Sequence, residues 1–281
     1  NEAGGYGTSK TTFNVVAGTA YQIAVDGFGG ASGNIALNVN YAYAFTTFAG
    51  SGGYGHADGT GSSAQFKQPA GVALDGAGNL YVADIDDSTI RKITPAGVVS
   101  TFAGLSGVVG QTDGTGSGAR FAQPLGVAVD SGGNVFVIEL GNNSPGALRK
   151  ITPAGVVTTL ASGFNQPFGV ALDGAGNAYV TDSNNSVIKK FTPAGVVTTV
   201  AGQFGVYGDD DGPVGTATLG GPVAPAIDAA GNIFVATGSQ TIRNISASGF
   251  VCTFAGISGG YGSSNGVGIA ARFDSANGLA F

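Results

Sequence analysis

Four polar residues stand at the same place in a repeated phrase. Asp84, Glu139, Asp182 and Thr237 each end a run of β-forming residues, and Asn184 follows Asp182 closely. Where repeated sheets surround one axis, such positions converge on one end of the central channel, and convergent oxygen atoms bind cations or polar ligands. We therefore predict that Asp84, Glu139, Asp182 and Asn184 form a ligand-binding rim, with hairpin capping or pairing with neighbours as the alternative.

A second group of carboxylates belongs to glycine-rich insertions. Asp209, Asp210 and Asp211 are adjacent and repel one another unless solvated or neutralised, so they are the metal-binding candidates, with calcium as the cation. The run alone supplies fewer oxygens than calcium requires. The position of Asp211, eight residues before Leu219, recurs in Asp58, Asp113 and Asn265, each followed by glycine. An aspartate or asparagine before glycine most simply caps a turn, and a side chain in that role needs no metal ion. We therefore expect no cofactor, with calcium as the alternative.

Catalytic residues are not expected. His56 is the only histidine, which excludes zinc sites built from several histidines, and no nucleophile-elbow phrase is present. Cys252 is the only cysteine, so no disulfide forms within the chain.

Paired bases recur as Arg91-Lys92, Arg149-Lys150 and Lys189-Lys190. We expect one base of each pair to pack its methylenes against a neighbouring repeat and to meet an acidic partner.

These residues belong to a repeat that predicts the fold. The phrase that begins at Phe66 returns from Phe121, from Phe164 and, in a degenerate form, from Leu219. Successive turn prolines of the repeat are 55, 43 and 55 residues apart, at Pro69, Pro124, Pro167 and Pro222. A unit near 43 residues that sometimes carries a dozen more suits a four-stranded propeller blade.

Alternation and turn residues place four strands in each unit. In the first unit they are Val72–Leu74, Leu80–Ala83, Thr89–Ile93 and Val98–Phe102. The phrase Asp75-Gly-Ala-Gly-Asn79 predicts a tight hairpin between the first two strands, and Thr94-Pro-Ala-Gly97 predicts another between the last two. The fold class is therefore an all-β propeller of four-stranded blades.

The repeat also resembles a known family. Gly-Val-Ala-Leu-Asp at 71–75, Gly-Asn-Leu-Tyr-Val-Ala-Asp at 78–84 and Ile-Arg-Lys-Ile at 90–93 are similar to the NHL repeat. The resemblance covers roughly residues 45–281 and implies a propeller of typically six blades. It implies fold more than activity, since similar propellers include binding scaffolds, RNA binders and a few lyases.

Both ends of the repeat array match parts of a blade. Residues 45–50 match the outer strand and following glycine at 100–104, and residues 273–281 match the inner-strand phrase at 66–74. This arrangement is expected when two ends of a chain share a closing blade, which removes free sheet edges. We therefore expect four complete blades plus parts of a closing blade in residues 45–281, truncated at the C-terminus, and six blades in the full-length ring.

The first 44 residues have a different pattern. Apolar residues alternate around Phe13, Tyr21 and Ile35, which predicts three half-buried strands. The phrase at 17–27 resembles the closing strands of prepeptidase-C-terminal-like β-sandwich modules, which occur in exported bacterial proteins. We expect residues 1–44 to be the C-terminal strands of such a sandwich.

Charge and composition narrow the partners. The net charge of −6 disfavours nucleic acid, and no apolar run is long enough to predict membrane insertion. We predict a non-catalytic extracellular or cell-surface binding or scaffold module of a larger exported bacterial protein, with a protein, glycan or cell-wall ligand. The alternatives are a calcium-dependent propeller lactonase or lyase, and a surface protein that self-assembles through unpaired strands.

Overall fold

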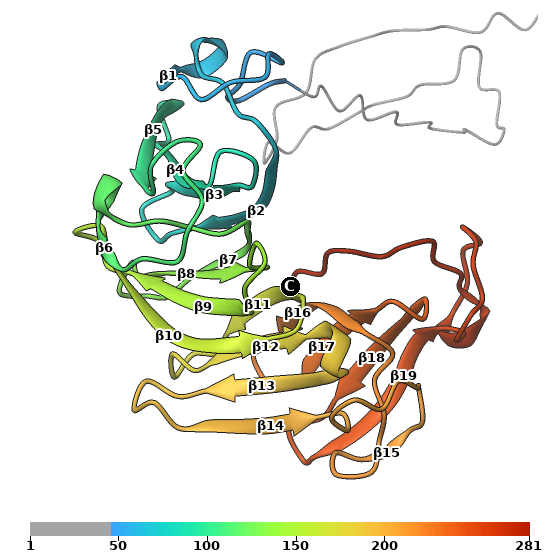
Figure 1. The fold of residues 1–281 in the computed structure, drawn as a ribbon. Coiled ribbons are helices and arrows are strands. Elements are labelled where there is room, and N and C mark those ends of the chain that lie inside the picture. The colour runs from blue at the N-terminus through green and yellow to red at the C-terminus, as the bar shows by residue number, and fades with distance from the viewer. Residues whose placement is uncertain (1–45) are drawn as a thin grey trace, which may run out of the picture. The chain divides into compact units, whose positions relative to one another are not determined.

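Four antiparallel sheets follow one another along the chain in the computed structural model, which describes residues 46–281 (Figure 1). Each sheet is one copy of the repeat, and we number the copies blade 1 to blade 4. The β-sandwich strands predicted for residues 1–44 lie outside the described residues. None of the helices in the described range is long and apolar enough to cross a membrane.

Blades 1 and 2 contain five strands each, four long and one short. Blade 1 has the order β1-β5-β4-β3-β2, with β1 (Gly59–Thr60), β2 (Pro69–Leu74), β3 (Leu80–Asp84), β4 (Thr89–Ile93) and β5 (Val98–Ala103). Blade 2 has the order β6-β10-β9-β8-β7, with β6 (Gly114–Thr115), β7 (Pro124–Val129), β8 (Val135–Glu139), β9 (Gly146–Ile151) and β10 (Val156–Phe164).

Blade 3 differs from the others because it has four strands. Its order is β11-β12-β13-β14, with β11 (Pro167–Leu172), β12 (Ala178–Asp182), β13 (Val187–Phe191) and β14 (Val197–Ala201). Blade 4 has the order β15-β19-β18-β17-β16, with β15 (Gly212–Pro213), β16 (Pro222–Ile227), β17 (Ile233–Thr237), β18 (Thr241–Ile245) and β19 (Phe250–Gly256). Short 3-10 turns are η2 (Gly61–Ser63), η3 (Gly116–Gly118), η4 (Ser183–Asn185) and η5 (Gly268–Ala270).

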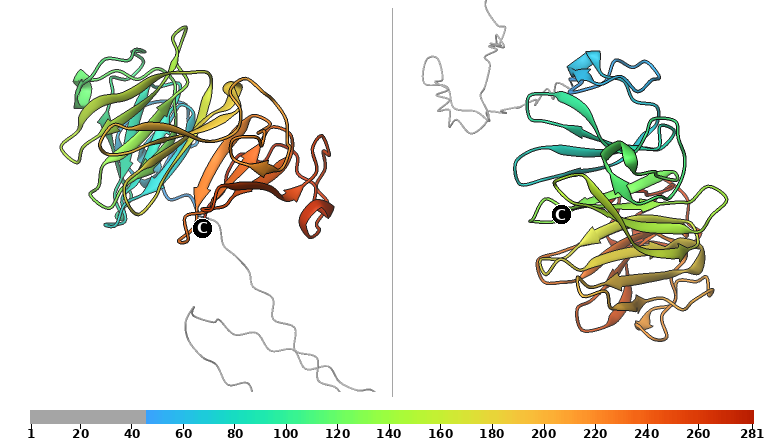
Figure 2. Two further views of the ribbon diagram at one scale, coloured as in Figure 1. Left: turned by 90° about the horizontal axis from the view of Figure 1, so that it is seen from below. Right: turned by 60° about the vertical axis from the view of Figure 1, so that its left-hand side comes forward.

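The inner strands of successive blades lie side by side. β2 contacts β7, β7 contacts β11, and β11 contacts β16, as the turned views also show (Figure 2). They surround a central cavity of about 450 Å³. Glycine in the inner-strand phrase permits this approach, because a Cβ on Gly126 would lie 2.7 Å from the carbonyl oxygen of Phe168, and one on Gly169 would lie 2.6 Å from that of Val223. The protein is therefore a β-propeller, as the repeat predicted.

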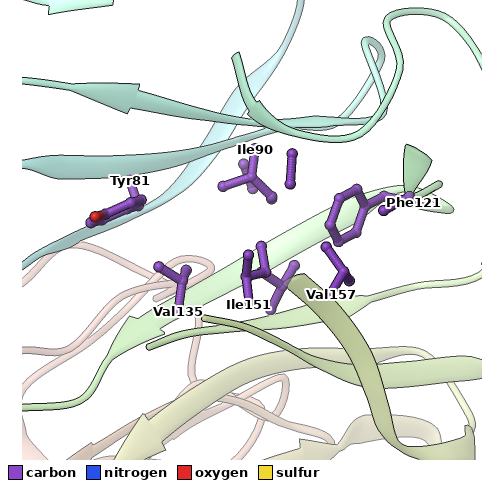
Figure 3. Close-up of a cluster of buried hydrophobic side chains, with 10 residues drawn as sticks. Tyr81, Ile90, Phe121, Val135, Ile151 and Val157 are labelled. Carbon is purple, nitrogen blue, oxygen red and sulfur yellow. The ribbon is translucent and has the colours of Figure 1, made fainter. Parts of the chain in front are cut away.

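The core lies between blades. On β8, Val135 and Val137 pack toward blade 1, where they join Tyr81 and Ile90 (Figure 3). Phe136 and Ile138, which alternate with them, pack toward blade 3. A third cluster joins blade 3 to blade 4. Because successive side chains of a strand point to opposite faces, blades 2 and 3 are each buried on both sides by neighbouring blades.

The predicted hairpins are confirmed. In blade 1, Asp75 Oδ1 accepts hydrogen bonds from the backbone N–H groups of Ala77 at 2.9 Å and Asn79 at 2.8 Å. Asp130, Asp173 and Asp228 make the same bonds in the other blades. These self-contained turns set the register between the first and second strands of each blade.

The two predicted pieces of a closing blade do not form strands. Residues 46–50 have no strand, and in 273–281 only Phe273 makes an isolated bridge, to Tyr261. A strand requires hydrogen-bonded partners, and no adjoining strand of such a blade lies among the described residues. The second piece nevertheless occupies an inner-strand position, because residues 277–279 line the central cavity and Phe281 packs on Phe234 with ring centres 5.1 Å apart. A ring of six blades stays a prediction.

Candidate functional site

The three acidic rim candidates end the second strands of their blades. Asp84, Glu139 and Asp182 stand opposite the prolines that begin the inner strands, Pro69, Pro124 and Pro167. All three side chains are completely buried. Asn184 lies in η4 and is exposed. Among the described residues that line the central cavity, none carries an ionisable side chain.

Each buried carboxylate bonds to groups of its own blade or of the segment that leads into it. Asp84 accepts hydrogen bonds from the backbone N–H groups of Lys67 at 3.0 Å and Gln68 at 2.7 Å. Asp182 accepts one from the N–H of Asn165 at 2.8 Å and one from Asn185 Nδ2 at 2.9 Å.

Glu139 and Asn184 complete the set. Glu139 accepts hydrogen bonds from Gln111 Nε2 at 3.0 Å and Arg149 Nη1 at 2.7 Å, and Asn184 donates one to Asn165 Oδ1 at 3.2 Å. The structure therefore does not bring the four rim candidates together around the channel, because buried carboxylates take the nearest N–H donors. Ligand binding by these residues stays a prediction.

Burial raises the pKa values of two rim acids, Glu139 and Asp84. It raises the pKa of Glu139 to about 7, against the opposing effect of the Arg149 guanidinium. Burial also raises the pKa of Asp84, although backbone N–H groups favour its ionised form. Burial acts in the same direction on Asp87, but hydrogen bonds from Lys67 and Ser106 hold the pKa of this carboxyl below its usual value.

The most regular polar feature is a buried arginine on the third strand of blades 1, 2 and 4. Arg91, Arg149 and Arg243 are completely buried. Arg149 Nη2 donates to Asp113 Oδ1 at 2.8 Å and to the carbonyl oxygen of Thr112 at 3.2 Å, while Nη1 bonds to Glu139. One side chain thus connects the insertion that precedes the blade with the end of the second strand.

The insertion aspartate also bonds to the outer strand. Asp58 accepts hydrogen bonds from Arg91 Nη2 at 2.7 Å and from the backbone N–H of Thr101 at 3.2 Å. Asp211 accepts them from Arg243 Nη2 at 2.7 Å and from the N–H of Thr253 at 2.9 Å. The recurrent Asp-Gly position therefore holds the insertion on the edge of its blade.

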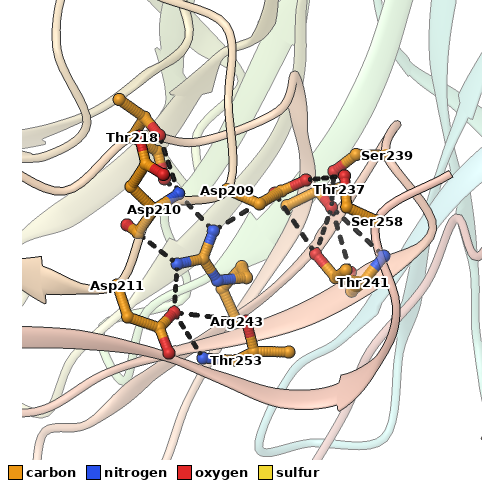
Figure 4. Close-up of polar contacts among 10 residues, drawn as sticks. All are labelled: Asp209, Asp210, Asp211, Thr218, Thr237, Ser239, Thr241, Arg243, Thr253 and Ser258. Carbon is orange, nitrogen blue, oxygen red and sulfur yellow. Dashed lines mark hydrogen bonds and ion pairs between the residues drawn. The ribbon is translucent and has the colours of Figure 1, made fainter. Parts of the chain in front are cut away.

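Blade 4 replaces one carboxylate with another. Its second strand ends in Thr237, where blades 1 and 2 have an acid, and Arg243 Nη1 instead contacts Asp209 Oδ1 at 3.1 Å (Figure 4). Ser258 donates a hydrogen bond to Asp209 Oδ2 at 2.6 Å. The insertion thus supplies from Asp209 the negative charge that Thr237 lacks.

In this arrangement Arg243 neutralises part of the acidic run. The sequence made these residues the metal-binding candidates because adjacent carboxylates repel one another unless solvated or neutralised, and Arg243 supplies a positive charge between Asp209 and Asp211. Within residues 46–281, no group of three or more His, Cys, Asp or Glu side chains is arranged to hold a metal ion. A metal site at Asp209, Asp210 and Asp211 stays a prediction.

Blade 3 has a lysine at the arginine position. Lys189 Nζ lies 3.4 Å from Asp182 Oδ2, and its side chain is 25% exposed. The linker between blades 2 and 3 is short, since β10 ends at Phe164 and β11 begins at Pro167. No insertion carboxylate from the described chain reaches this lysine.

The second base of each pair packs on an aromatic ring. Lys92 Nζ lies 5.6 Å from the ring centre of Tyr81, and Lys190 Nζ lies 5.4 Å from that of Tyr179. Lys150 makes the same contact with Phe136. Each lysine stands directly opposite its ring on the neighbouring strand of its own blade, and not against a neighbouring repeat as the sequence predicted; the other base of each pair meets the acidic partner.

The sequence analysis did not identify a set of exposed side chains on one face. Because the strands of a blade are antiparallel, the insertions and the connections from second to third strand lie at the same end, which we call the loop face. Tyr54, Tyr207 and Tyr261 are 64–70% exposed there, and Val109 occupies the same position in the second insertion. The signal was present, since each stands twelve residues before Phe66, Leu219, Phe273 or Phe121.

Local contacts hold two of these tyrosines. Tyr54 donates a hydrogen bond to Asp86 Oδ2 at 3.1 Å. The Tyr207 ring lies close to Gly221, since a Cβ added to this glycine would be 3.5 Å from the ring. The insertions also bond to the connections between second and third strands. The N–H group of Gly107 donates to the carbonyl oxygen of Asp87, and that of Gly205 to the carbonyl oxygen of Asn185, each at 2.9 Å. The loop face therefore presents aromatic side chains on anchored loops.

The fold and these contacts define a β-propeller with insertions anchored by buried arginines. No family model matches the chain. An auxiliary nutrient binding protein from Bacteroides thetaiotaomicron is similar in structure, with a TM-score of 0.53 and 20% identity, over 84% of this chain and 70% of that one. A protein of unknown function from the same organism is similar over the same shares, with a TM-score of 0.52 and 21% identity. These likenesses show the fold alone.

One curated protein matches part of the chain. The chloroplastic protein SUPPRESSOR OF QUENCHING 1 of Arabidopsis thaliana is 33% identical over 91 residues, which is 32% of this chain. The match spans 8% of the plant protein's length.

Proposed function

We propose that this chain is a non-catalytic binding or scaffold module, an NHL-type propeller of an exported bacterial protein that binds a protein, glycan or cell-wall ligand on its loop face. The observation that carries the proposal is the exposure of Tyr54 and Tyr207 on insertions that the buried Arg91 and Arg243 anchor, with Tyr261 equally exposed at the matching position of the last insertion. Loops that are ordered before binding lose less conformational entropy when a ligand arrives.

The composition of the loops supports the same function. The insertions are rich in glycine, serine and tyrosine, and Phe204, three residues before Tyr207, is 70% exposed. Tyrosine contributes a large contact area at low entropic cost, and glycine and serine adapt to a partner's polar groups. A propeller of similar structure is an auxiliary nutrient binding protein, which agrees with a binding role.

The state of the ionisable groups favours binding over catalysis. Asp84, Glu139 and Asp182 are buried and bonded within the fold, and Arg149 and Arg243 are committed to carboxylates. A general acid or base must reach its substrate within hydrogen-bonding distance. These groups stabilise the loop face instead.

A loop-face double variant tests the proposal. The chain carrying Phe204→Ala and Tyr207→Ala is compared with the original chain on a glycan microarray, on purified peptidoglycan and in capture of surface proteins from a bacterial culture. We expect the original chain to bind one of these and the double variant to lose at least tenfold in affinity. Phe250→Ala is the control, because Phe250 is exposed at the opposite end of its blade.

Two results would overturn the proposal. If the double variant retained full binding, the loop face would not be the binding site. If the original chain bound none of the three, the proposed function would be wrong.

A calcium titration tests the enzymatic alternative. A rise in Tm that Asp211→Asn removes would favour the calcium-dependent lactonase or lyase, because a ligand stabilises the folded state that binds it.

A further inference from the structure

Three of the four blades cover their own outer edge. β1 pairs with β5 through Gly59 and Thr60, β6 pairs with β10, and β15 pairs with β19. The insertion that precedes each of these three blades supplies this short fifth strand. The aspartate that stands immediately before the short strand bonds to the outer strand. Blade 3 has no such insertion, so β14 meets no fifth strand from residues 46–281.

The edge of β14 has the properties that proteins usually avoid on an open strand. Val196 and Val197 are 55% and 50% exposed, and Thr198 and Thr199 are also exposed. No charged residue, proline or glycine interrupts the strand from Val197 to Ala201. Native edge strands commonly carry charges, bulges or a covering segment, because an open row of N–H and C=O groups invites pairing.

The same edge has a cation without an insertion partner. Arg91, Arg149 and Arg243 each bind the aspartate of a covering segment, and each is completely buried. Lys189 stands at their position and retains 25% exposure, because no segment of the described chain covers it. Thr199 matches Thr101 and Thr253, whose backbone N–H groups bond to the covering aspartate.

We propose that the edge of β14 is a docking site for an extended segment of a partner protein that carries an aspartate followed by glycine. The segment adds antiparallel to β14 as a fifth strand, and its carboxylate accepts hydrogen bonds from Lys189 Nζ and the N–H of Thr199. Blades 1, 2 and 4 show the same interaction made within one chain, so the molecule itself defines the chemistry of the occupant.

A second copy of β14 fits this edge less well than such a segment. The strand contains no acidic residue, so pairing of two β14 strands brings no carboxylate to either Lys189. A segment with an aspartate satisfies both the backbone groups and the lysine. This surface is the outer edge of one blade and not the loop face, so it stands or falls independently of the proposed function.

The chain's own covering segment is the probe. A peptide with the sequence of residues 107–118 contains Asp113-Gly114-Thr115, which covers blade 2. It is titrated into the isotope-labelled full chain, and amide chemical shifts are recorded. We expect saturable changes at Val197, Thr199 and Lys189, with a dissociation constant in the micromolar to millimolar range, because the peptide adds a short strand.

Matched variants test the carboxylate contact. The peptide with Asp113→Asn and the chain with Lys189→Gln should each bind about tenfold more weakly, because a charge-assisted hydrogen bond is lost. Lys190→Gln is the control, since Lys190 packs on Tyr179 and should leave the affinity unchanged. Unchanged spectra elsewhere in the chain show that each variant is folded.

Three outcomes would overturn the proposal. The first is the absence of saturable shifts at β14. The second is equal affinity of the chain for the original peptide and for the peptide with Asp113→Asn, which would show that the carboxylate makes no contact with the edge. The third is concentration-dependent broadening of β14 signals without peptide, which would show that a second copy occupies the edge.

Discussion

Blades 2 and 3 are adjacent copies of one repeat, yet they treat a strand cation in opposite ways. Arg149 is completely buried between Asp113 and Glu139, whereas Lys189 is partly exposed and has Asp182 as its single carboxylate partner in the described chain. Blade 2 has an insertion that covers β10, and blade 3 has none. The arginine, the insertion aspartate and the covering strand are thus present together or absent together.

Physical chemistry explains why these features occur as a set. A guanidinium has five N–H donors and stays charged, so burying it requires several acceptors and negative partners. The insertion supplies an aspartate and a backbone carbonyl oxygen, and the second strand supplies the other carboxylate. A lysine with one carboxylate keeps its ammonium group near water, which suits a blade without an insertion.

The largest expected difference between blades 2 and 3 is the loss of unfolding free energy when the cationic side chain on the third strand is removed. Arg149→Met leaves Glu139 buried and Asp113 without its partner, and we expect a loss of about 3–5 kcal/mol in the free energy of unfolding. Lys189→Met should cost about 1 kcal/mol or less, because its ion pair is partly exposed. Urea denaturation of the full chain measures both values. Equal losses would contradict the distinction between the blades.

Blade 4 offers a test by exchange of carboxylates. Asp209→Asn should destabilise the chain by about 2 kcal/mol, since Arg243 loses one of two negative partners. Adding Thr237→Asp places an acid where blade 1 has Asp84, and we expect it to recover at least half of the loss. The double-variant cycle in urea measures the coupling. Additive losses would show that Asp209 does not replace the missing acid.

The pH dependence sharpens the account of blade 2. The folded-state pKa of Glu139 is about 7, above its ordinary value of 4.5, so the folded state binds the proton more tightly. Its contribution to stability is complete below pH 4.5 and is lost as the pH rises to 7, at about 1.4 kcal/mol per pH unit. The difference in unfolding free energy between the original chain and Glu139→Gln should follow this slope. Parallel curves would contradict it.

The smallest effect is expected from giving blade 3 an arginine. Lys189→Arg should change the free energy of unfolding by less than about 0.5 kcal/mol, because no insertion carboxylate is present to receive the added donors. Urea denaturation again provides the measurement. A stabilisation well above that value would mean that arginine alone, without an insertion, builds the buried pair.

Much of the fold was predictable because local patterns determine it. The strand predicted at Thr89–Ile93 has those bounds in the structure, and the hairpin at Asp75–Asn79 bonds as expected. Alternation identified the two faces of each strand, and the repeat identified the neighbours that bury them. These features depend on residues close together in sequence or on the recurrence itself.

The carboxylates were harder to assign because their partners are distant in sequence. Asp58 and Arg91 are 33 residues apart, and Asp209 and Arg243 are 34 apart. The recurrent aspartate and the paired bases were each noticed, but their contact was not inferred. The usable signal was joint variation among the repeats, since the copy without an insertion has Lys189 and the copy with Thr237 has Asp209.

Amide hydrogen exchange measures most directly whether insertions anchored by arginine cover the blade edges. The N–H groups of Thr101 and Thr253 donate to Asp58 and Asp211, whereas Thr199 has no such partner from the described chain. We predict that Thr101 and Thr253 exchange slowly, and that Thr199 exchanges at a rate close to that of an open edge. Equal protection of all three amides would contradict the account.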